Sequence, residues 1–196
     1  SLRFWGGGYY EEDELFEICD ELGVCVWLDF KFACSAYPAF DDSFMENVRL
    51  EVRDQVRRLR HHACIAVWCG NNEIGLMTKE QWSDSSMGKA DYQKLFRDLI
   101  GQQVKELAPQ ANYVTGSPDC GDIHYWEVWH GKKPFEIYRT KDGFMSEFGF
   151  QSFPHPKTVR AYTAEADRAS VLSPVMRWHQ RSNNDGNEKI MAMIES

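Results

Sequence analysis

The chain has 196 residues, of which 43% are hydrophobic and 14% aromatic, a composition that excludes a disordered chain and predicts a folded domain with a sizeable core. The formal net charge is −8, with 30 acidic against 22 basic residues. The attraction to phosphate that drives non-specific nucleic-acid binding is therefore missing, and we expect no nucleic-acid partner.

The cysteines and the hydropathy of the chain exclude two further classes. Six cysteines form no C-x-x-C pair and no His-x-x-x-His spacing accompanies them, so we expect reduced structural thiols and no zinc. No segment reaches about 18 consecutive apolar residues, and no basic-then-apolar leader opens the chain, so we expect no membrane span. The compartment stays open, with cytoplasm or periplasm expected for a bacterial source.

The predicted elements begin with the end of a strand at residues 2–5. A helix follows over residues 11–22, with acids in its first turn and Gly23 as its stop. Its predicted buried face consists of Leu15, Ile18, Cys19 and Leu22. The next apolar run predicts a buried strand over residues 24–28, with Asp29 at its carboxyl end.

Two longer helices and two strands follow. Asp42 or Ser43 is expected to cap a helix that runs to about Arg60 and buries Met45, Val48, Val52, Val56 and Leu59. A strand is predicted over residues 64–69 and another over 113–115. Between them, a helix over residues 89–107 is expected to bury Tyr92, Leu95, Phe96, Leu99 and Val104.

The remaining elements are shorter. Strands are predicted at residues 122–125 and 144–146, with a helix-like segment at 134–139 between them. Helices are expected near residues 158–169 and 188–194. Apolar strands that alternate with amphipathic helices predict an α/β fold with a parallel sheet covered by helices, and no linker-like stretch divides it.

Two parallel architectures compete for this pattern. A doubly wound sheet that binds nucleotides would need a glycine-rich turn, but the glycines at Gly6 lack the G-x-G-x-x-G order and precede acids that would repel a pyrophosphate. A TIM-type barrel fits better because polar residues recur at predicted carboxyl strand ends, where barrel active sites lie. These residues are Asp29, Asn71, Asn72, Glu73, His124, Tyr125, Trp126 and Glu147.

Glu73 and Glu147 are the candidate catalytic residues. Glycosidic bond cleavage needs two carboxyl groups, one to protonate the leaving oxygen and one to attack the anomeric carbon or to activate water. Ordinary solvated acids at strand ends are the alternative. Aromatic side chains near predicted strand ends could stack on a sugar ring or simply fill a core: Trp5, Tyr125, Trp126 and Trp129.

Four segments, in this order, resemble the catalytic barrel of beta-mannosidases in glycoside hydrolase family 2: RFWGGGYYEEDELFEICDELGVCVWLDFKFACSAYP, RLRHHACIAVWCGNNE, GDIHYWEVWHGKKPF and SEFGFQSFP. The resemblance extends from Leu2 to about Ile194. It implies that Glu73 is the acid/base and Glu147 the nucleophile of a retaining mechanism, without metal or organic cofactor. The charge of Glu147 is then expected to keep Glu73 protonated until the glycosyl intermediate forms.

Further residues acquire roles from the resemblance. Asn72 is expected to hydrogen-bond the sugar 2-hydroxyl, or else to cap its loop. Arg3, Trp5 and Asp29 are expected to border the sugar site, although Arg3 could instead pin a neighbouring carboxylate. His124 is expected to line the mouth or to orient a loop, and Tyr125, Trp126 and Trp129 are the other expected substrate contacts.

The resemblance also implies an incomplete (β/α)8 barrel. It places residues 2–5 on the second strand and 144–146 on the seventh, so strands one and eight and the flanking domains are missing. Residues 1–196 are then a partial catalytic domain of a larger multidomain glycosidase, and we expect the chain alone to be poorly stable or to self-associate. In the usual family pattern N-H-P-S precedes the acid/base strand, where this chain has His61, His62, Ala63 and Cys64.

The function that follows is removal of terminal beta-mannosyl units from oligosaccharides by double displacement. The alternatives are a related family 2 specificity, such as an endo-acting mannosidase or a beta-galactosidase, and a carbohydrate-binding fragment without turnover.

Overall fold

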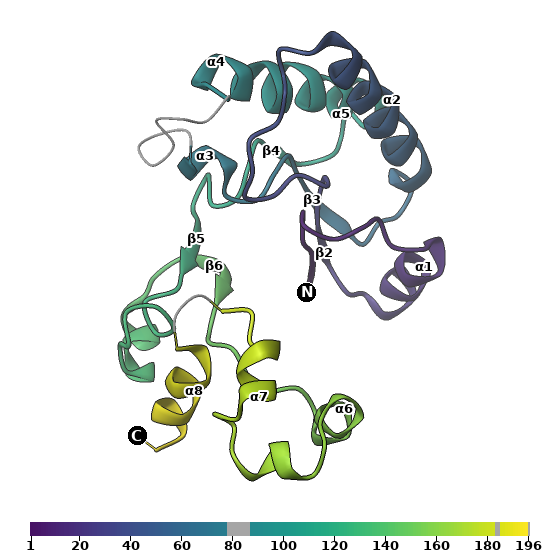
Figure 1. The fold of residues 1–196 in the computed structure, drawn as a ribbon. Coiled ribbons are helices and arrows are strands. Elements are labelled where there is room, and N and C mark those ends of the chain that lie inside the picture. The colour runs from purple at the N-terminus through teal and green to yellow at the C-terminus, as the bar shows by residue number, and fades with distance from the viewer. Residues whose placement is uncertain (78–86, 183–184, 196) are drawn as a thin grey trace. The chain divides into compact units, whose positions relative to one another are not determined.

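The structure is a computed structural model that describes residues 1–77, 87–182 and 185–195. The chain forms two compact units, Ser1–His124 and Tyr125–Ser196, which are described separately (Figure 1). Within the described segments, no helix combines the length and apolar character that crossing a membrane would need.

The first unit is built on a four-stranded parallel sheet. Its strands are β1 (Leu2–Phe4), β2 (Val26–Asp29), β3 (Ile65–Cys69) and β4 (Tyr113–Val114), and they are neighbours in the order in which they occur in the chain. Because parallel strands share a direction, their carboxyl ends meet at one edge of the sheet. The predicted strands 24–28, 64–69 and 113–115 agree with β2, β3 and β4 to within two residues at each end. For β1, the predicted strand end at residue 5 lies one residue after the observed one.

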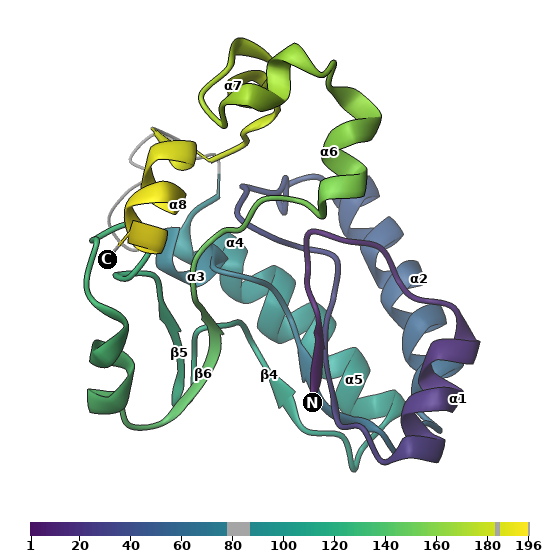
Figure 2. The same ribbon diagram turned by 90° about the horizontal axis from the view of Figure 1, so that it is seen from below.

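Helices connect these strands and cover the sheet, as Figure 2 shows for α2 (Asp42–Leu59) and α5 (Gln102–Leu107). Helix α2 packs along α5 and along the π-helical stretch η1 (Gln93–Gly101), which precedes α5. All five residues expected to form the buried face of α2 are buried. Its cap is one residue earlier than expected, because the Asp41 side chain accepts hydrogen bonds from the backbone N–H groups of Ser43 and Phe44.

The buried face of α1 (Asp13–Leu22) differs from the predicted one. Phe16 and Cys19 are buried, whereas Ile18 is 43% and Leu22 69% exposed. Asp20 explains the rotation, because its carboxylate accepts hydrogen bonds from the Cys64 backbone N–H at 2.6 Å and from His62 Nδ1 at 2.7 Å. The helix therefore turns Asp20 toward the start of β3, and this moves Ile18 and Leu22 to solvent.

The helix predicted over residues 89–107 is divided into α4 (Lys89–Tyr92), η1 and α5. Within η1 the Tyr113 hydroxyl donates to the Phe96 backbone oxygen, and this side-chain contact accompanies the wider turn. The wider turn brings Ile100 into the core in place of Leu99, which is only partly buried. The short helix α3 (Ile74–Met77) precedes these elements.

The second unit has shorter elements around a small core. Strand β5 (Asp122–Tyr125) ends at Tyr125, the first residue of the second unit. The unit also contains β6 (Phe144–Phe148), η2 (Phe135–Thr140), α6 (Pro156–Tyr162), η3 (Ala166–Ala169), α7 (Pro174–His179) and α8 (Gly186–Glu195). The helix α7, which Ser173 caps, was not predicted. Buried side chains include Val128, Trp129, Met176 and Ile190.

The fold is thus mixed α/β, and the part of the chain that the structure describes contains a parallel four-stranded sheet rather than a closed barrel. The incomplete eight-stranded barrel stays a prediction.

Candidate active site

A buried ion pair lies at the carboxyl edge of the sheet. Arg3, on β1, donates from Nη2 to Asp29 Oδ2 at 2.8 Å, and the Asp29 side chain is 0% exposed. Asp29 also accepts hydrogen bonds from the Gly6 backbone N–H at 3.0 Å and from Trp27 Nε1 at 2.8 Å. These donors offset the cost of burying a carboxylate. Arg3 therefore pins a neighbouring carboxylate, which was one of its two expected roles.

Arg3 also contacts Asn72, which follows β3. Its Nη2 donates to Asn72 Oδ1 at 2.8 Å, and Asn72 Nδ2 donates to Cys34 Sγ at 3.4 Å. Asn72 is 1% exposed, and each end of its amide has a hydrogen-bond partner. A contact between Asn72 and a sugar hydroxyl stays a prediction.

Glu73 is positioned by an unusual backbone conformation. Its φ is +61°, in the left-handed region that non-glycine residues seldom occupy, and its N–H donates to the Ser117 backbone oxygen at 2.7 Å. The neighbouring Asn71 side chain accepts from the Ile74 N–H at 3.1 Å and donates to the Thr115 oxygen at 2.8 Å. These contacts close the turn after β3 and aim the Glu73 side chain, which is 28% exposed.

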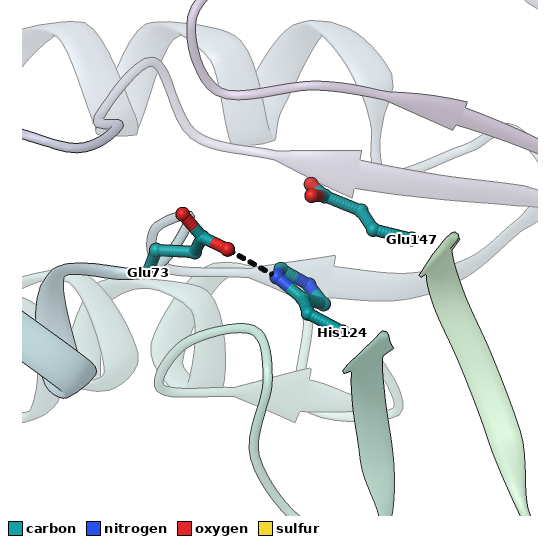
Figure 3. Close-up of side chains that lie close together, drawn as sticks. All are labelled: Glu73, His124 and Glu147. Carbon is teal, nitrogen blue, oxygen red and sulfur yellow. Dashed lines mark hydrogen bonds and ion pairs between the residues drawn. The ribbon is translucent and has the colours of Figure 1, made fainter. Parts of the chain in front are cut away.

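His124, on β5, forms the shorter of two side-chain contacts to the Glu73 carboxylate. Its Nδ1 lies 2.8 Å from Glu73 Oε1, and a dashed line marks this contact in Figure 3. The Cys34 thiol donates to Glu73 Oε2 at 3.5 Å. The hydrogen bond from His124 lowers the pKa of the Glu73 carboxyl, against an opposing effect of burial, and Cys34 and Arg3 add to the lowering.

The far side of the His124 ring meets two residues that the sequence analysis did not single out. Its Nε2 lies 2.8 Å from Ser117 Oγ, which also hydrogen-bonds to Asp122 Oδ2. Asp122 could have been found from sequence, because residues two apart on a strand share a face. Ser117 could not, since it reaches His124 only through the turn after β4. Cys34, which meets Glu73 through a loop, was also missed.

Trp5 is 45% exposed at the end of β1. A Cβ at Gly7 would collide with the Trp5 ring, so this glycine lets the ring lie against the backbone. A half-exposed flat ring is compatible with the expected stacking on a sugar.

The other expected site residues lie in the second unit. Glu147 is on β6 and partly buried. Tyr125 has the Lys141 Nζ 4.3 Å from its ring centroid, and Trp126 is partly buried beside His130. Trp129 is only 3% exposed, with Lys189 Nζ 5.3 Å from its ring centroid. Trp129 is thus largely buried, and its expected contact with the substrate stays a prediction.

The first unit therefore brings together Arg3, Asp29, Asn72, Glu73 and His124, together with Cys34, Ser117 and Asp122. The pairing of Glu73 with Glu147 stays a prediction.

Comparisons with known proteins identify the relatives of the chain. No protein-family model matches it. It is 36% identical over 214 residues to beta-mannosidase B of Emericella nidulans and 38% identical over 213 residues to that of Neosartorya fischeri. Each alignment covers 97% of this chain and 25% of the relative.

A solved structure agrees with these sequences. The beta-D-mannosidase of Dictyoglomus thermophilum superposes with a TM-score of 0.89 at 35% identity, over 99% of this chain and 25% of that protein. The chain spans about a quarter of the length of the curated relatives that it matches. Nearly every residue of the chain is thus matched by one segment of these proteins, and over that segment the chain is similar in sequence and in fold to beta-mannosidases.

Proposed function

We propose that this chain carries part of the active site of a retaining beta-mannosidase, which removes terminal β-D-mannosyl residues by double displacement. The observation that carries the proposal is Glu73. It stands at the carboxyl end of a parallel strand, in a constrained backbone conformation, with His124 on one carboxylate oxygen and Cys34 on the other. Strained residues cluster at functional sites, and the homology is to enzymes named for this activity.

In this proposal Glu73 is the acid/base and Glu147 the nucleophile. Glu147 attacks the anomeric carbon while Glu73 protonates the departing oxygen, and water then releases the mannosyl group with Glu73 as base. The neighbours of Glu73 in the first unit lower the pKa of its carboxyl, and the nearby charge of Glu147 is proposed to act in the opposite direction and keep Glu73 protonated until the glycosyl intermediate forms.

The remaining expected residues border the sugar. Asn72 is proposed to bind the 2-hydroxyl, and the half-exposed ring of Trp5 to stack on the sugar face. Arg3 and Asp29 act as a buried support for Asn72. Tyr125 and Trp126 are proposed as further contacts from the second unit.

The proposed architecture is the catalytic (β/α)8 barrel of a larger multidomain glycosidase, with β1 to β4 as its second to fifth strands and β5 and β6 as its sixth and seventh. The sequential order of the parallel strands supports a barrel, because a doubly wound sheet reverses its order at a switch point. The other two strands would then come from outside residues 1–196.

The test is turnover of para-nitrophenyl β-mannoside by the 196-residue chain. We expect Glu147→Gln to abolish nitrophenol release and Glu73→Gln to reduce kcat at least 100-fold, because each removes a group that acts in the transition state. Glu12→Gln, on the exposed part of the first unit, is the matched control and should retain activity.

A mechanism-based probe separates the two roles. A 2-deoxy-2-fluoro-β-mannosyl fluoride should leave a covalent mannosyl label on the peptide that contains Glu147. A label on Glu73 would reverse the roles, and the absence of both turnover and label would overturn the proposal for this chain. A panel with the β-galactoside and β-glucoside would then report which sugar the site accepts.

A further inference from the structure

The turn that follows β1 folds the Trp5 ring back onto its own backbone. The Gly8 N–H donates to the Trp5 backbone oxygen at 3.1 Å, and this hydrogen bond closes a tight turn that contains Gly7. A Cβ at Gly7 would lie 1.9 Å from Trp5 Cζ3, 2.3 Å from Cη2 and 2.6 Å from Cε3. The six-membered part of the indole therefore lies directly against the Gly7 backbone, in space that a side chain at this position would fill.

The three successive glycines of this turn differ in what surrounds them. A Cβ at Gly6 would lie 2.5 Å from the Phe32 backbone oxygen, so the absence of a side chain there lets two segments of backbone approach. A Cβ at Gly8 would lie 3.3 Å from the Trp5 oxygen, which a small adjustment accommodates. Neither Gly7 nor Gly8 has a positive φ. Gly7 is thus needed for the Trp5 ring and not for the path of the chain.

The same turn is attached to the buried ion pair of the candidate site. The Gly6 N–H donates to Asp29 Oδ2 at 3.0 Å, and this oxygen also accepts from Arg3 Nη2 at 2.8 Å. Arg3 Nη2 in turn donates to Asn72 Oδ1 at 2.8 Å. The backbone that carries Trp5 and the residue that precedes the proposed acid/base are therefore held by one network.

The Trp5 ring itself is fixed on one side and open on the other. Lys31 Nζ donates to the Trp5 backbone oxygen at 3.3 Å, which adds a second hydrogen bond to that of the turn. The residue is nevertheless 45% exposed. An exposed ring that is already held in place loses little conformational freedom when a ligand stacks on it.

We propose that Gly7 is a positioning residue: by lacking a side chain, it keeps the Trp5 ring in the orientation in which the mannosyl unit of the substrate stacks on its open side. This proposal rests on the proposed function, in which Trp5 contacts the sugar. Because the three closest atoms to a Cβ at Gly7 belong to a half-exposed side chain, Gly7→Ala should displace the ring and leave the fold intact.

The first experiment follows the ring by ¹⁹F NMR in the 196-residue chain labelled with 5-fluorotryptophan. Trp5→Phe assigns the Trp5 signal by its loss. We expect Gly7→Ala to move this signal toward that of free fluorotryptophan and to leave the signals of the other tryptophans in place. Gly8→Ala adds the same methyl group one residue later and is the matched control, in which the Trp5 signal should stay where it is.

Two results of this experiment would overturn the proposal. An unmoved Trp5 signal in Gly7→Ala would show that the ring does not depend on the glycine. Collapse of all the tryptophan signals to one position would show that the variant is unfolded, so that Gly7 is needed for the backbone and not for the ring.

The second experiment is a double-mutant cycle on the binding of methyl β-D-mannoside. Trp5→Ala and Gly7→Ala should each raise the dissociation constant about tenfold, because each removes the stacked ring from the sugar. The two changes together should raise it no further, because Gly7 acts only through Trp5. A combined rise of about 100-fold would mean that Gly7 acts independently, and it would overturn the proposal.

Turnover of para-nitrophenyl β-mannoside adds a measurement that a loss of folded protein would not reproduce. In an active chain, Gly7→Ala should raise KM about tenfold with a smaller change in kcat, because stacking on the sugar is present before the transition state as well as in it. A lower kcat at an unchanged KM would be a loss of active protein and would count against the positioning role. Gly8→Ala should change KM less than about twofold.

The failure of this proposal is distinguishable from a failure of the proposed function. If Trp5→Ala leaves the dissociation constant unchanged, Trp5 does not contact the sugar, and the role of Gly7 in binding is overturned with it. If the unmodified chain neither binds nor hydrolyses mannosides, the proposed function is contradicted, while the ¹⁹F signal still decides whether Gly7 places the ring.

Discussion

At the scale of single residues, Glu73 combines a strained backbone with a satisfied side chain. Its left-handed conformation costs on the order of 1–3 kcal/mol, and that of Cys34, at a φ of +45°, places a second strained residue against it. Hydrogen bonds from His124 and Cys34 hold the Glu73 carboxylate in place. The fold therefore supports an orientation of Glu73 that an unconstrained loop would not keep.

The lowered pKa of Glu73 predicts how stability depends on pH. A carboxyl whose folded pKa lies below its unfolded value of about 4.3 stabilises the fold above that value, and this contribution is lost as the pH falls through the folded pKa. The free energy of unfolding of the unmodified chain should therefore fall more between pH 6 and pH 3 than that of Glu73→Gln. Urea unfolding at several pH values measures this, and equal slopes would contradict it.

The Arg3–Asp29 pair predicts a large effect on stability. Arg3→Met should lower the free energy of unfolding by about 3 kcal/mol, because it leaves the 0% exposed Asp29 carboxylate without its cation. Adding Asp29→Asn to this variant should restore part of the loss by removing the buried charge. Denaturant unfolding of the three proteins decides, and a double variant less stable than Arg3→Met would show that Asp29 matters for reasons other than its charge.

At the scale of elements, α1 shows how one polar contact can override an apolar pattern. The apolar residues of this helix can form either of two buried faces. The structure buries the face with Phe16 and Cys19, beside the partly exposed Asp20, and not the predicted face with Ile18 and Leu22. The Cys64 N–H and His62 Nδ1 need an acceptor there. Although partial burial opposes it, the hydrogen bonds from His62 and Cys64 lower the pKa of the Asp20 carboxyl.

Removing the acceptor on α1 should therefore destabilise the first unit. We expect Asp20→Ala to lower the free energy of unfolding by about 1–3 kcal/mol, because it leaves the Cys64 N–H and the buried His62 without their partner. Asp20→Asn keeps one acceptor oxygen and should cost less. Glu21→Ala, an exposed acid on the same helix, is the control, and thermal or urea unfolding that ranks all three variants alike would refute the assigned role.

At the scale of the whole molecule, the sheet of the first unit has open edges. Within the part of the chain that the structure describes, β1 and β4 are its outer strands, and Leu2 on β1 is 44% exposed. Unpaired edges of a parallel sheet can pair with other chains. The barrel of the proposed function would cover both edges.

We therefore expect the 196-residue chain to self-associate or to unfold below about 50 °C. Size-exclusion chromatography with light scattering and a thermal melt measure this directly. A sharp monomeric peak together with a cooperative transition above about 50 °C would contradict it.

Local patterns were enough to predict much of this protein. The apolar spacing of α2 and the short apolar runs of β2 and β3 determine these elements, because each buries one continuous face whatever its neighbours are. Polar residues at predicted strand ends likewise indicated Asn72, Glu73 and His124 as site residues, because the carboxyl ends of parallel strands meet at one edge of a sheet. The resemblance to beta-mannosidases rested on quoted segments and agrees with the relatives found.

Only the tertiary structure decided the contacts that cross between elements. The face of α1, the π-helical stretch η1 and the burial of Trp129 depend on partners far away in the sequence, such as Cys64 for Asp20 and Tyr113 for Phe96. The same holds for the environment of Glu73, where His124 and Asp122 of β5 meet Ser117, which follows β4. Hydrogen bonds are short and directional, so a linear pattern cannot predict which partners a fold will bring within reach.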